Sequence, residues 1–437
     1  MKKTKRITAI ILSALMTVSA FSALSVSAAT VDSNAPVVSA DDNLVSGDFK
    51  YSVLDDGTVE IAKYLGSDTD VSIPEKIDGK VVSSIGSWTF YDCTSLTSIT
   101  IPDSVTSISD DAFSNCENLT DITIPDSVTS IGSRAFYGCK SLTSITIPDS
   151  VTNIGDDAFC FCENLTDITI PNSVTYIGVR AFCNTGITSI VVPDSVSNLG
   201  GGAFSGCEKL KTAKLPKSLN VIPDNLFSQC YELENVNIPN TVTKIDTQAF
   251  QDCEKLSKVN LPSSLKEIGI YAFNGCTSLT NINIPDNLEI VGAMSFCDCS
   301  LTQITLPKSV TEINEYALGY NDLYPNSMYF EASKIADFKI YGYKNTAAEK
   351  YAQDNEFEFI ALDDEVVTGD SNQDGIVNVN DVTYLQRHLA GSLNTDGSAL
   401  IDETSKALFD CLDLNKDGKL TVADVTALQI YISENNW

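Results

Sequence analysis

Polar and apolar residues alternate in a unit of 23 residues that repeats along most of the chain. In the copy at 142–148, polar Ser144 and Thr146 separate apolar side chains, and this period of two predicts a short strand with one buried face. The proline that closes the copy lacks an N–H group for a ladder and ends the strand. It recurs, in steps of 23 residues and twice of 22, at positions 102, 125, 148, 171, 193, 216, 239, 262, 285 and 307. A fixed period in this range predicts a solenoid, in which each unit buries its apolar face against its neighbours.

A second apolar stretch follows each predicted strand. In the same unit Val151 and Ile154 are apolar, and Gly155 predicts a turn. We expect residues 157–159 to lead to the next strand as a short helical turn or an irregular segment. This segment ends in a phenylalanine that we interpret as a stacked core spine, at Phe90, Phe113, Phe136, Phe159, Phe182, Phe204, Phe227, Phe250, Phe273 and Phe296.

Both ends of the repeat region depart from the unit and are interpreted as caps, which solenoids need to cover their terminal apolar faces. Residues 51–61 predict a hairpin with its turn at Asp56 and Gly57. At the other end, 338–362 breaks the repeat with a predicted helix over Thr346–Asn355 and a strand over Phe357–Leu362.

The outward strand positions form the natural binding face of such a solenoid. The early copies carry Thr with Asp or Ser, whereas later copies are rich in Asn and include Lys214 and Lys258. No exposed aromatic platform is predicted at these positions, and aromatic rings are the usual stacking partners of sugars. Two interpretations stay open: hydrogen-bonded ladders that stabilise stacked strands, or a polar face that recognises a protein or a polysaccharide.

After residue 362 the composition changes, and two 12-residue loops place oxygen-bearing side chains at calcium-ligand spacing. Side-chain oxygens at positions 1, 3 and 5, glycine at 6, a backbone carbonyl at 7 and a carboxylate at 12 are what a calcium loop requires. We therefore predict two Ca²⁺ ions, each held by one loop. The predicted ligands are Asp370, Asn372, Asp374, Ile376, Asn378 and Asp381 in the first loop, and Asp413, Asn415, Asp417, Lys419, Thr421 and Asp424 in the second.

A predicted helix follows each loop, and the two copies are offset by 43 residues. Their apolar positions match, with Val382, Leu385 and Leu389 of the first copy corresponding to Val425, Leu428 and Ile432 of the second. The duplication predicts a small all-α calcium-binding domain. Its three Asp residues in each loop repel one another without a cation, so we expect metal removal to unfold it.

The repeat motif LTxIxIPxSVTxIGxxAFxxC, over residues 47–362, resembles the BspA-type bacterial leucine-rich repeat family, which is often found on secreted and surface proteins. The resemblance implies a leucine-rich repeat solenoid with a parallel β-sheet and short helical turns. The duplicated loop and helix, over 368–433, resemble a type I dockerin. This family attaches proteins to the cohesin domain of a scaffold protein, as in cellulosomes.

The resemblance to dockerins also implies which residues contact cohesin. In that family the contacts come from positions 10, 11, 17 and 18 of each copy. Here the copies agree at two of these positions and differ at the other two, which leaves open whether docking has one or two orientations. The implied contact residues are Val379, Asn380, Gln386, Arg387, Val422, Ala423, Gln429 and Ile430.

The N-terminal segment predicts secretion. Lys2, Lys3, Lys5 and Arg6 precede an apolar stretch, and small residues at 26–29 suit a signal peptidase. Removing this segment takes the net charge from −30 to −34, which argues against nucleic acid and anionic lipid as partners. No second run long enough to span a membrane is predicted. We expect a signal peptide at 1–29, a linker at 30–46, the capped solenoid at 47–362, a linker at 363–369 and the dockerin at 370–433.

Nine of the thirteen cysteines lie three residues after the repeated phenylalanine and form one ladder. Because cysteine packs as a small buried hydrophobe, free thiols are favoured over disulfides between neighbouring units. A metal site is disfavoured because the single histidine, His388, lies outside the repeats. The ladder comprises Cys93, Cys116, Cys139, Cys162, Cys207, Cys230, Cys253, Cys276 and Cys299.

No catalytic residue is identified, and the lone histidine argues against Ser-His-Asp and Cys-His chemistry in the repeats. The sequence therefore favours a secreted, non-catalytic protein at the cell surface or on a cellulosome. Its dockerin would bind a cohesin, and its solenoid would bind a protein that the sequence does not identify. The alternatives are a subunit that targets carbohydrate and an enzyme that degrades polysaccharide.

Overall fold

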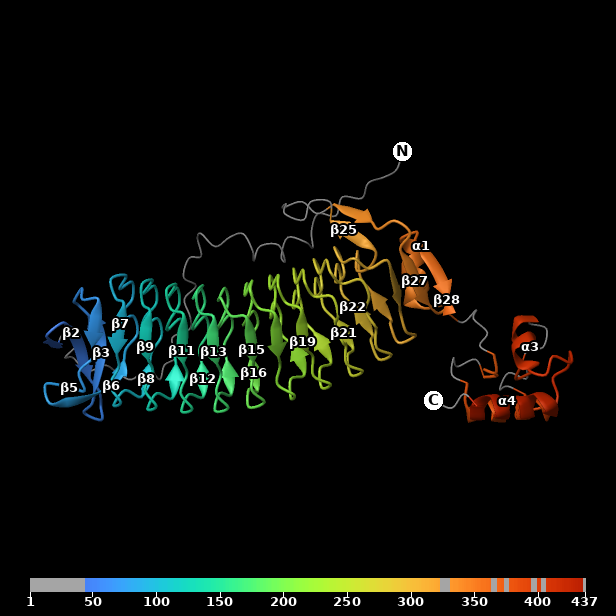
Figure 1. Ribbon diagram of the computed structural model, residues 1–437, viewed down its shortest axis with the longest axis horizontal. Helices are drawn as coiled ribbons and strands as arrows, with labels where there is room; N and C mark the ends of the chain where they lie inside the picture. The colour runs from blue at the N-terminus through green and yellow to red at the C-terminus, as the bar shows by residue number, and fades with distance from the viewer. Residues whose placement is uncertain are drawn as a thin grey trace. The chain divides into compact units, whose positions relative to one another are not determined.

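Most of the chain is a stack of coils, each built from one repeat unit, in the computed structural model (Figure 1). The structure describes residues 44–322, 331–362, 368–372, 377–393, 399–401 and 406–434. These residues fall into two units, one extending to residue 280 with 292–300 and 314–335, the other comprising 281–291, 301–313 and 336 onward. The predicted signal peptide and most of the linker at 30–46 lie outside the described residues.

Each coil begins with the strand that the alternating pattern predicts. In all of these strands except β19 the central residue is buried, and its neighbours are mostly exposed, as in Ser144–Thr146. Successive strands pair in parallel, one coil apart, as β4-β7-β9, β11-β13 and β15-β17-β19. Their bounds are β4 Asp70–Ser72, β7 Ser98–Thr100, β9 Asp121–Thr123, β11 Ser144–Thr146, β13 Asp167–Thr169, β15 Ser189–Val191, β17 Thr212–Lys214 and β19 Asn235–Asn237, with β23 Gln303–Thr305 in the second unit.

Two copies differ from this expectation, because 258–260 and 281–283 do not form strands. Their central residues Val259 and Ile282 are nevertheless buried, each 7% exposed. One inward apolar side chain per copy is therefore enough to hold the path of the coil, even where the ladder is missing.

A second short strand in each coil was not predicted. In the copies of the first unit it pairs in parallel as β6-β8-β10-β12-β14-β16 and as β18-β20-β21. Most of these strands span two residues with one buried apolar side chain, a signal too short to distinguish from a turn. They are β6 Lys80–Ile85, β8 Ser107–Ile108, β10 Ser130–Ile131, β12 Asn153–Ile154, β14 Tyr176–Ile177, β16 Asn198–Leu199, β18 Val221–Ile222, β20 Lys244–Ile245 and β21 Glu267–Ile268; the second unit has β22 Ile290–Val291 and β24 Glu312–Ile313.

The phenylalanine spine is confirmed. All ten rings, from Phe90 to Phe296, are at most 1% exposed. Each stacks on the ring of the next coil, with centroids 5.1–5.8 Å apart. The rings therefore form a continuous apolar core along the coils of the first unit.

The segment before each phenylalanine is a hydrogen-bonded turn, the irregular one of the two forms that we expected. One residue of each turn has a left-handed backbone, with φ between 54° and 62°. Left-handed backbone costs an L-residue about 1–2 kcal/mol. Hydrogen bonds between coils offset this cost; the Arg134 N–H, for example, donates to the Asp156 carbonyl at 2.8 Å. These residues are Trp88, Asp111, Arg134, Asp157, Arg180, Gly202, Asn225, Gln248, Tyr271, Met294 and Tyr316.

The ladder cysteines are free thiols, as predicted, and all except Cys93 are buried. From Cys116 onward each thiol donates to the carbonyl oxygen of the phenylalanine in the preceding coil, at 3.1–3.2 Å. Burial raises the pKa of Cys162 to about 12 and that of Cys207 to about 11. The ladder therefore holds neutral thiols at neutral pH, which suits packing and not metal binding.

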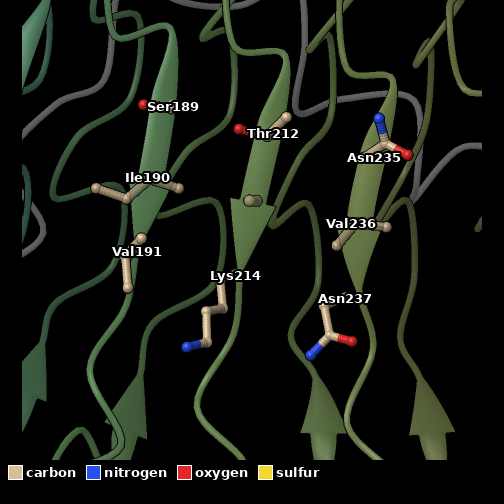
Figure 2. A pocket seen from close by; sticks show the side chains of 9 residues that line it. Ser189, Ile190, Val191, Thr212, Lys214, Asn235, Val236 and Asn237 are labelled. Carbon is tan, nitrogen blue, oxygen red and sulfur yellow. The ribbon is translucent and has the colours of Figure 1, made fainter.

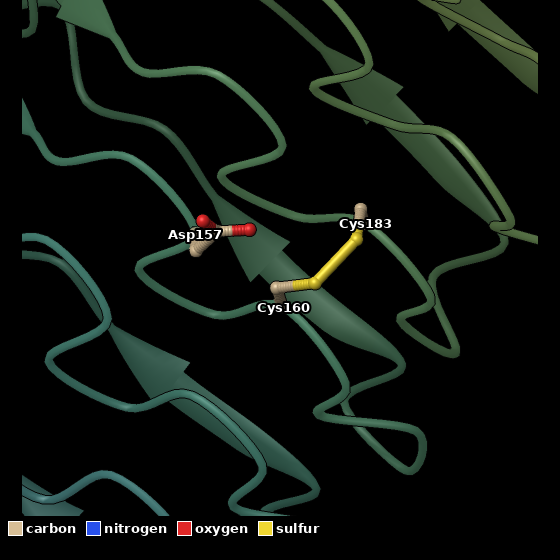
Figure 3. A group of neighbouring side chains, drawn as sticks. All are labelled: Asp157, Cys160 and Cys183. Carbon is tan, nitrogen blue, oxygen red and sulfur yellow. A yellow bond between two sulfur atoms is a disulfide. The ribbon is translucent and has the colours of Figure 1, made fainter. Parts of the chain in front are cut away.

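One disulfide does join neighbouring coils, but it lies outside the ladder. Cys160 and Cys183, each directly after a spine phenylalanine, are bonded to each other (Figure 3). This pair was not predicted, because neither cysteine lies at the ladder position.

Both predicted caps are present. At the start, β1 Leu44–Ser46, β2 Phe49–Val53 and β3 Val59–Tyr64 pair antiparallel, and Gly57 takes φ of 81° in the expected turn. β3 then pairs in parallel with β6, and β5 Lys76–Ile77 lies against the same strand. The first unit also contains a hairpin of β25 Tyr320–Asp322 and β26 Ala332–Lys334.

In the second unit, β23 pairs with β27 Lys339–Gly342, which pairs with β28 Glu358–Ala361. Between them, α1 Ala347–Asp354 lies between Thr346 and Asn355 as its caps, which confirms the predicted helix. The end of the repeat region is thus closed by a helix and a short parallel sheet.

The C-terminal helices are α2 Val379–Leu389, α3 Lys406–Leu412 and α4 Val422–Glu434. Their core comprises Val382, Leu385, Ile401, Leu408, Cys411, Leu412, Val425 and Leu428. The matched apolar positions of the two copies therefore meet in one small core. Within the described part of the chain, no helix is long and apolar enough to cross a membrane.

Candidate functional site

The second predicted calcium loop closes around the carboxylate of Asp413, which is only 8% exposed. The N–H groups of Asp417 and Gly418 donate to its two oxygens at 3.0 and 2.8 Å. Asn415 accepts the Asp417 N–H as well, at 2.8 Å. Gly418 takes φ of 80°, the conformation for which glycine is needed at the sharp turn of such a loop.

The last carboxylate of this loop, Asp424, joins the loop to the helix that follows. It is fully buried in the first turn of α4, where the helix dipole favours a negative charge. It accepts the Thr421 N–H at 2.8 Å and the Asn415 N–H at 3.4 Å. One carboxylate therefore fixes both the middle and the end of the loop.

The first loop has the same arrangement in its described residues. Asp370 is 4% exposed and Asp381 is fully buried. Asp381 accepts the N–H groups of Asn378 at 2.8 Å and Asn372 at 3.2 Å, and the Asn378 side chain caps α2. The predicted ligands Asp374 and Ile376 lie outside the described residues.

Four buried carboxylates in two pairs are costly to hold in a small domain. Ionised carboxylates are buried at low cost only when they are paired or coordinate a metal. Asp370 and Asp381 belong to one loop, and Asp413 and Asp424 to the other. A hard divalent cation with oxygen ligands meets this requirement, so these donor sets fit Ca²⁺.

The eight residues implied as cohesin contacts all lie exposed on α2 and α4. Val379 and Val422 are 68% and 72% exposed, and Ile430 is 50% exposed. Large apolar side chains that stay exposed beside a formed core are a usual sign of a protein-binding surface. The same two helices bury Val382 and Val425 on their other faces.

The strand face, which we define as the outward positions of the first strand of each coil, is polar and exposed. A shallow hollow of about 340 Å³ lies on β15, β17 and β19. Figure 2 shows Ser189, Thr212 and Asn235 in one row along it and Val191, Lys214 and Asn237 in the next. This mixture of hydroxyl, amide and ammonium groups suits hydrogen bonding to a partner.

A second hollow, of about 400 Å³, lies on the turn edge, which we define as the left-handed residue of each coil with the residue before it. The sequence did not predict this hollow, because its residues lie in separate repeat units and outside the predicted strands. Trp88, at one of its coils, is 60% exposed. The lining residues are Ser87, Trp88, Asp110, Asp111, Ser133, Arg134, Asp156, Asp157 and Arg180.

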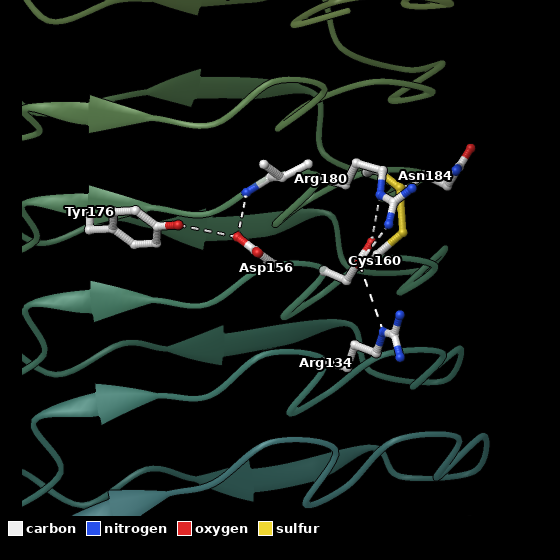
Figure 4. Close-up of polar contacts among 9 residues, drawn as sticks. Arg134, Asp156, Cys160, Tyr176, Arg180 and Asn184 are labelled. Carbon is white, nitrogen blue, oxygen red and sulfur yellow. Dashed lines mark hydrogen bonds and ion pairs between the residues drawn. A yellow bond between two sulfur atoms is a disulfide. The ribbon is translucent and has the colours of Figure 1, made fainter. Parts of the chain in front are cut away.

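An ion-pair network joins three of the coils that line this hollow (Figure 4). The buried Asp157 carboxylate accepts from Nε and Nη2 of Arg180 at 2.9 and 2.8 Å, and Nε of Arg134 lies 3.8 Å away on the preceding coil. The hydrogen bond to Asp157 raises the pKa of Arg180. Asp157, Cys160 and Cys183 also place ligand-type atoms within 4.8 Å of one another, but the two sulfurs are bonded together.

Two different protein families match the repeats and the C-terminal domain. A family model described as BspA type leucine rich repeat region matches residues 83–211 and 200–324, and a model described as dockerin type I domain matches 368–433. A search of curated proteins found no match.

Three solved structures are similar to the chain. A leucine rich cell surface protein from Faecalibacterium prausnitzii A2-165 is 28% identical with a TM-score of 0.46, covering 68% of this chain and 88% of its own. A leucine-rich repeat protein from Bacteroides ovatus is 25% identical with a TM-score of 0.47, covering 73% and 100%. The T. pallidum leucine rich repeat protein is 30% identical with a TM-score of 0.38, covering 49% and 90%.

Proposed function

The chain belongs to the BspA-type leucine-rich repeat family and ends in a type I dockerin domain, and from this premise we propose that it is a non-catalytic interaction protein carried by a scaffold. The dockerin binds a cohesin domain of the scaffold protein. The repeats bind a second protein through the strand face, as an adhesion or interaction module. The chain acts outside the cell, at the cell surface or on a cellulosome.

The exposed faces of α2 and α4 are the main support for cohesin binding. Eight side chains at equivalent positions of the two copies are exposed, and the first pair, Val379 and Val422, are apolar. The copies differ at Asn380 against Ala423 and at Arg387 against Ile430, so the two possible docking surfaces are chemically distinct. We propose that one orientation is preferred for this reason.

Two bound calcium ions order the helices that carry this surface. Type I dockerins bind calcium. The buried carboxylates of Asp381 and Asp424 lie in the first turns of α2 and α4, so a cation bound by each loop fixes the start of the helix that presents the contacts. We place the domain at residues 370–433 and the capped solenoid at 47–362.

The experiment is a calcium-dependent binding assay on the full chain with a panel of type I cohesin domains. We expect binding in millimolar calcium and none in excess chelator. Asp424→Ala should weaken binding strongly, because it removes a buried ligand at the start of α4. The matched control is Asp121→Ala, an exposed carboxylate on the strand face, and it should bind like the parent chain.

Two results would contradict the proposal. One is cohesin binding that survives chelation, and the other is equal weakening by both aspartate variants. Loss of binding in a double Val379→Asp, Val422→Asp variant that keeps its calcium would assign the contact to the helix faces and not to the loops.

A further inference from the structure

Five successive coils place a distinctive row of side chains on the turn edge. Their left-handed residues are Trp88, Asp111, Arg134, Asp157 and Arg180, so an aromatic ring is followed by alternating acidic and basic groups. Glycine is the residue that this backbone favours, and only one of the eleven equivalent positions, at residue 202, carries it. Residues with polar or aromatic side chains therefore occupy positions of this row at which glycine would be less strained.

Trp88 supplies an apolar platform at the start of the row. Its side chain is 60% exposed, and Tyr91, three residues later, is 48% exposed. Tryptophan is usually buried to a large extent, because its ring carries much apolar area. An indole held in water beside a groove is suited to pack against a flat ligand ring with apolar C–H groups.

The carboxylates of the groove are held in place by bonds to the backbone. Oδ1 of Asp110 accepts the Ser133 N–H at 2.7 Å. Oδ1 of Asp156 accepts the Val179 N–H at 2.8 Å and the Tyr176 hydroxyl at 3.3 Å (Figure 4). Because these bonds use Oδ1, Oδ2 of each residue provides a further acceptor in a fixed position. Side chains fixed in advance lose less entropy when a ligand binds.

Arg134 provides donors in the same groove. Its side chain is 55% exposed, and its contact with Asp157 is made through Nε at 3.8 Å. The guanidinium carries five N–H groups in a planar fork. The groove therefore offers donors and acceptors side by side, which is what ligands with many hydroxyl groups require.

The charge and the geometry of the groove indicate the class of ligand. Four aspartates and two arginines line it, and the chain has a net charge of −30, so acidic ligands are repelled. Asp157 is already paired with Arg180, and Arg134 lies within the row, which reduces the attraction of the groove for a cationic ligand. The coils are spaced at 5.1–5.4 Å here, as measured between spine rings, which favours a ligand that repeats along a straight axis.

We propose that this groove binds an extended, neutral polysaccharide, with one sugar ring stacked on Trp88 and hydroxyl groups bonded to Asp110, Asp156 and Arg134. This site lies on a different edge of the coils from the strand face and is independent of cohesin docking. It gives the chain a second binding activity, toward carbohydrate.

The test uses the fluorescence of Trp88 itself. The chain has two tryptophans, so Trp437→Phe leaves Trp88 as the only one in the full-length protein. This variant is titrated with hexasaccharides of β-1,4-linked glucose, xylose and mannose. We expect a saturable change in emission with at least one of them, and retardation of the protein in gels that contain the corresponding polymer.

Substitutions then separate this groove from the strand face. Trp88→Ala should abolish the retardation, and Arg134→Ala should weaken it at least tenfold. Lys214→Ala, on the strand face, is the matched control and should leave it unchanged. Circular dichroism of each variant verifies that the coils are intact, and all three variants should keep their affinity for cohesin.

The proposal is overturned if none of the three hexasaccharides changes the emission and none of the polymers retards the protein. It is equally overturned if Trp88→Ala is retarded like the parent chain. An emission change with oligolysine but with no sugar would reassign the groove to a basic peptide. Failure of cohesin binding would leave each of these readouts unaffected.

Discussion

Calcium removal should unfold the C-terminal domain while the repeats stay folded. A domain of this length, 66 residues by the matched range, has a total stability of about 3–10 kcal/mol at the usual 0.05–0.15 kcal/mol per residue. A ligand present at a thousand times its Kd stabilises the folded state by about 4 kcal/mol per site. Two sites together contribute about 8 kcal/mol, so their loss removes most or all of the stability expected of the domain.

The structure explains why the C-terminal domain is expected to be only marginally stable without calcium. Among its described residues, eight buried side chains form the core, and the same domain buries Asp370, Asp381, Asp413 and Asp424. Without cations, the carboxylates of each pair repel one another, and backbone N–H groups compensate them only in part. The repeats draw their stability from the spine and the ladders instead, and neither depends on metal.

The assay is far-ultraviolet circular dichroism at 222 nm during a chelator titration. The helices α2, α3 and α4 comprise 11, 7 and 13 residues, whereas α1 has 8, so most of the helical residues that the structure describes lie in the C-terminal domain. We expect that signal to fall on chelation and to return with calcium, while Trp88 emission, measured in the Trp437→Phe variant, stays constant. Helicity that is unchanged in excess chelator would refute the reasoning.

Three further predictions concern the repeats. Phe159→Ala should cost about 3–5 kcal/mol, because its ring is fully buried between two stacked neighbours; urea denaturation measures the loss, and a cost below 1 kcal/mol would contradict the core assignment. Burial raises the pKa of Asp252 to about 6, above its value in the unfolded chain. The free energy of unfolding should therefore fall by up to about 2 kcal/mol as the pH rises from 4 to 7. Asp252→Asn should remove that part of the pH dependence in urea titrations at each pH. A thiol reagent should titrate eleven cysteines in denaturant and thirteen after reduction, with Cys93 reacting first in the folded protein; fewer than eleven would mean that ladder thiols are oxidised.

The sequence predicted those parts of the fold that depend on repeated apolar positions. The strand, the spine and the cysteine ladder each depend on one inward side chain at a fixed place in the unit, so periodicity alone locates them. The hairpin around Gly57 and the helix between Thr346 and Asn355 carry local turn and helix signals. The calcium loops are equally local, since their ligands lie within twelve residues.

The turn edge could not be predicted in the same way. Its groove brings together residues that lie 23 positions apart, such as Asp110 with Ser133 and Asp157 with Arg180. Their closeness depends on the left-handed residue of each turn, which the sequence pattern does not specify. The Cys160–Cys183 disulfide was missed for the same reason, because only the stacked turns bring its two sulfurs together. Aligning the units one above another would have revealed the alternation of Asp and Arg.

The left-handed position of the turn accepts many kinds of side chain. Tryptophan, aspartate, arginine, glycine, asparagine, glutamine, tyrosine and methionine all occupy it, and φ stays between 54° and 62°. Backbone hydrogen bonds between neighbouring coils fix the conformation of this residue for each of these side chains. Where this residue is exposed, as at Trp88, a mutation changes what the coil offers to a ligand and leaves the core as it was. Gene duplication adds further coils with the same open position, so a lineage can acquire new specificities one substitution at a time without passing through unfolded intermediates.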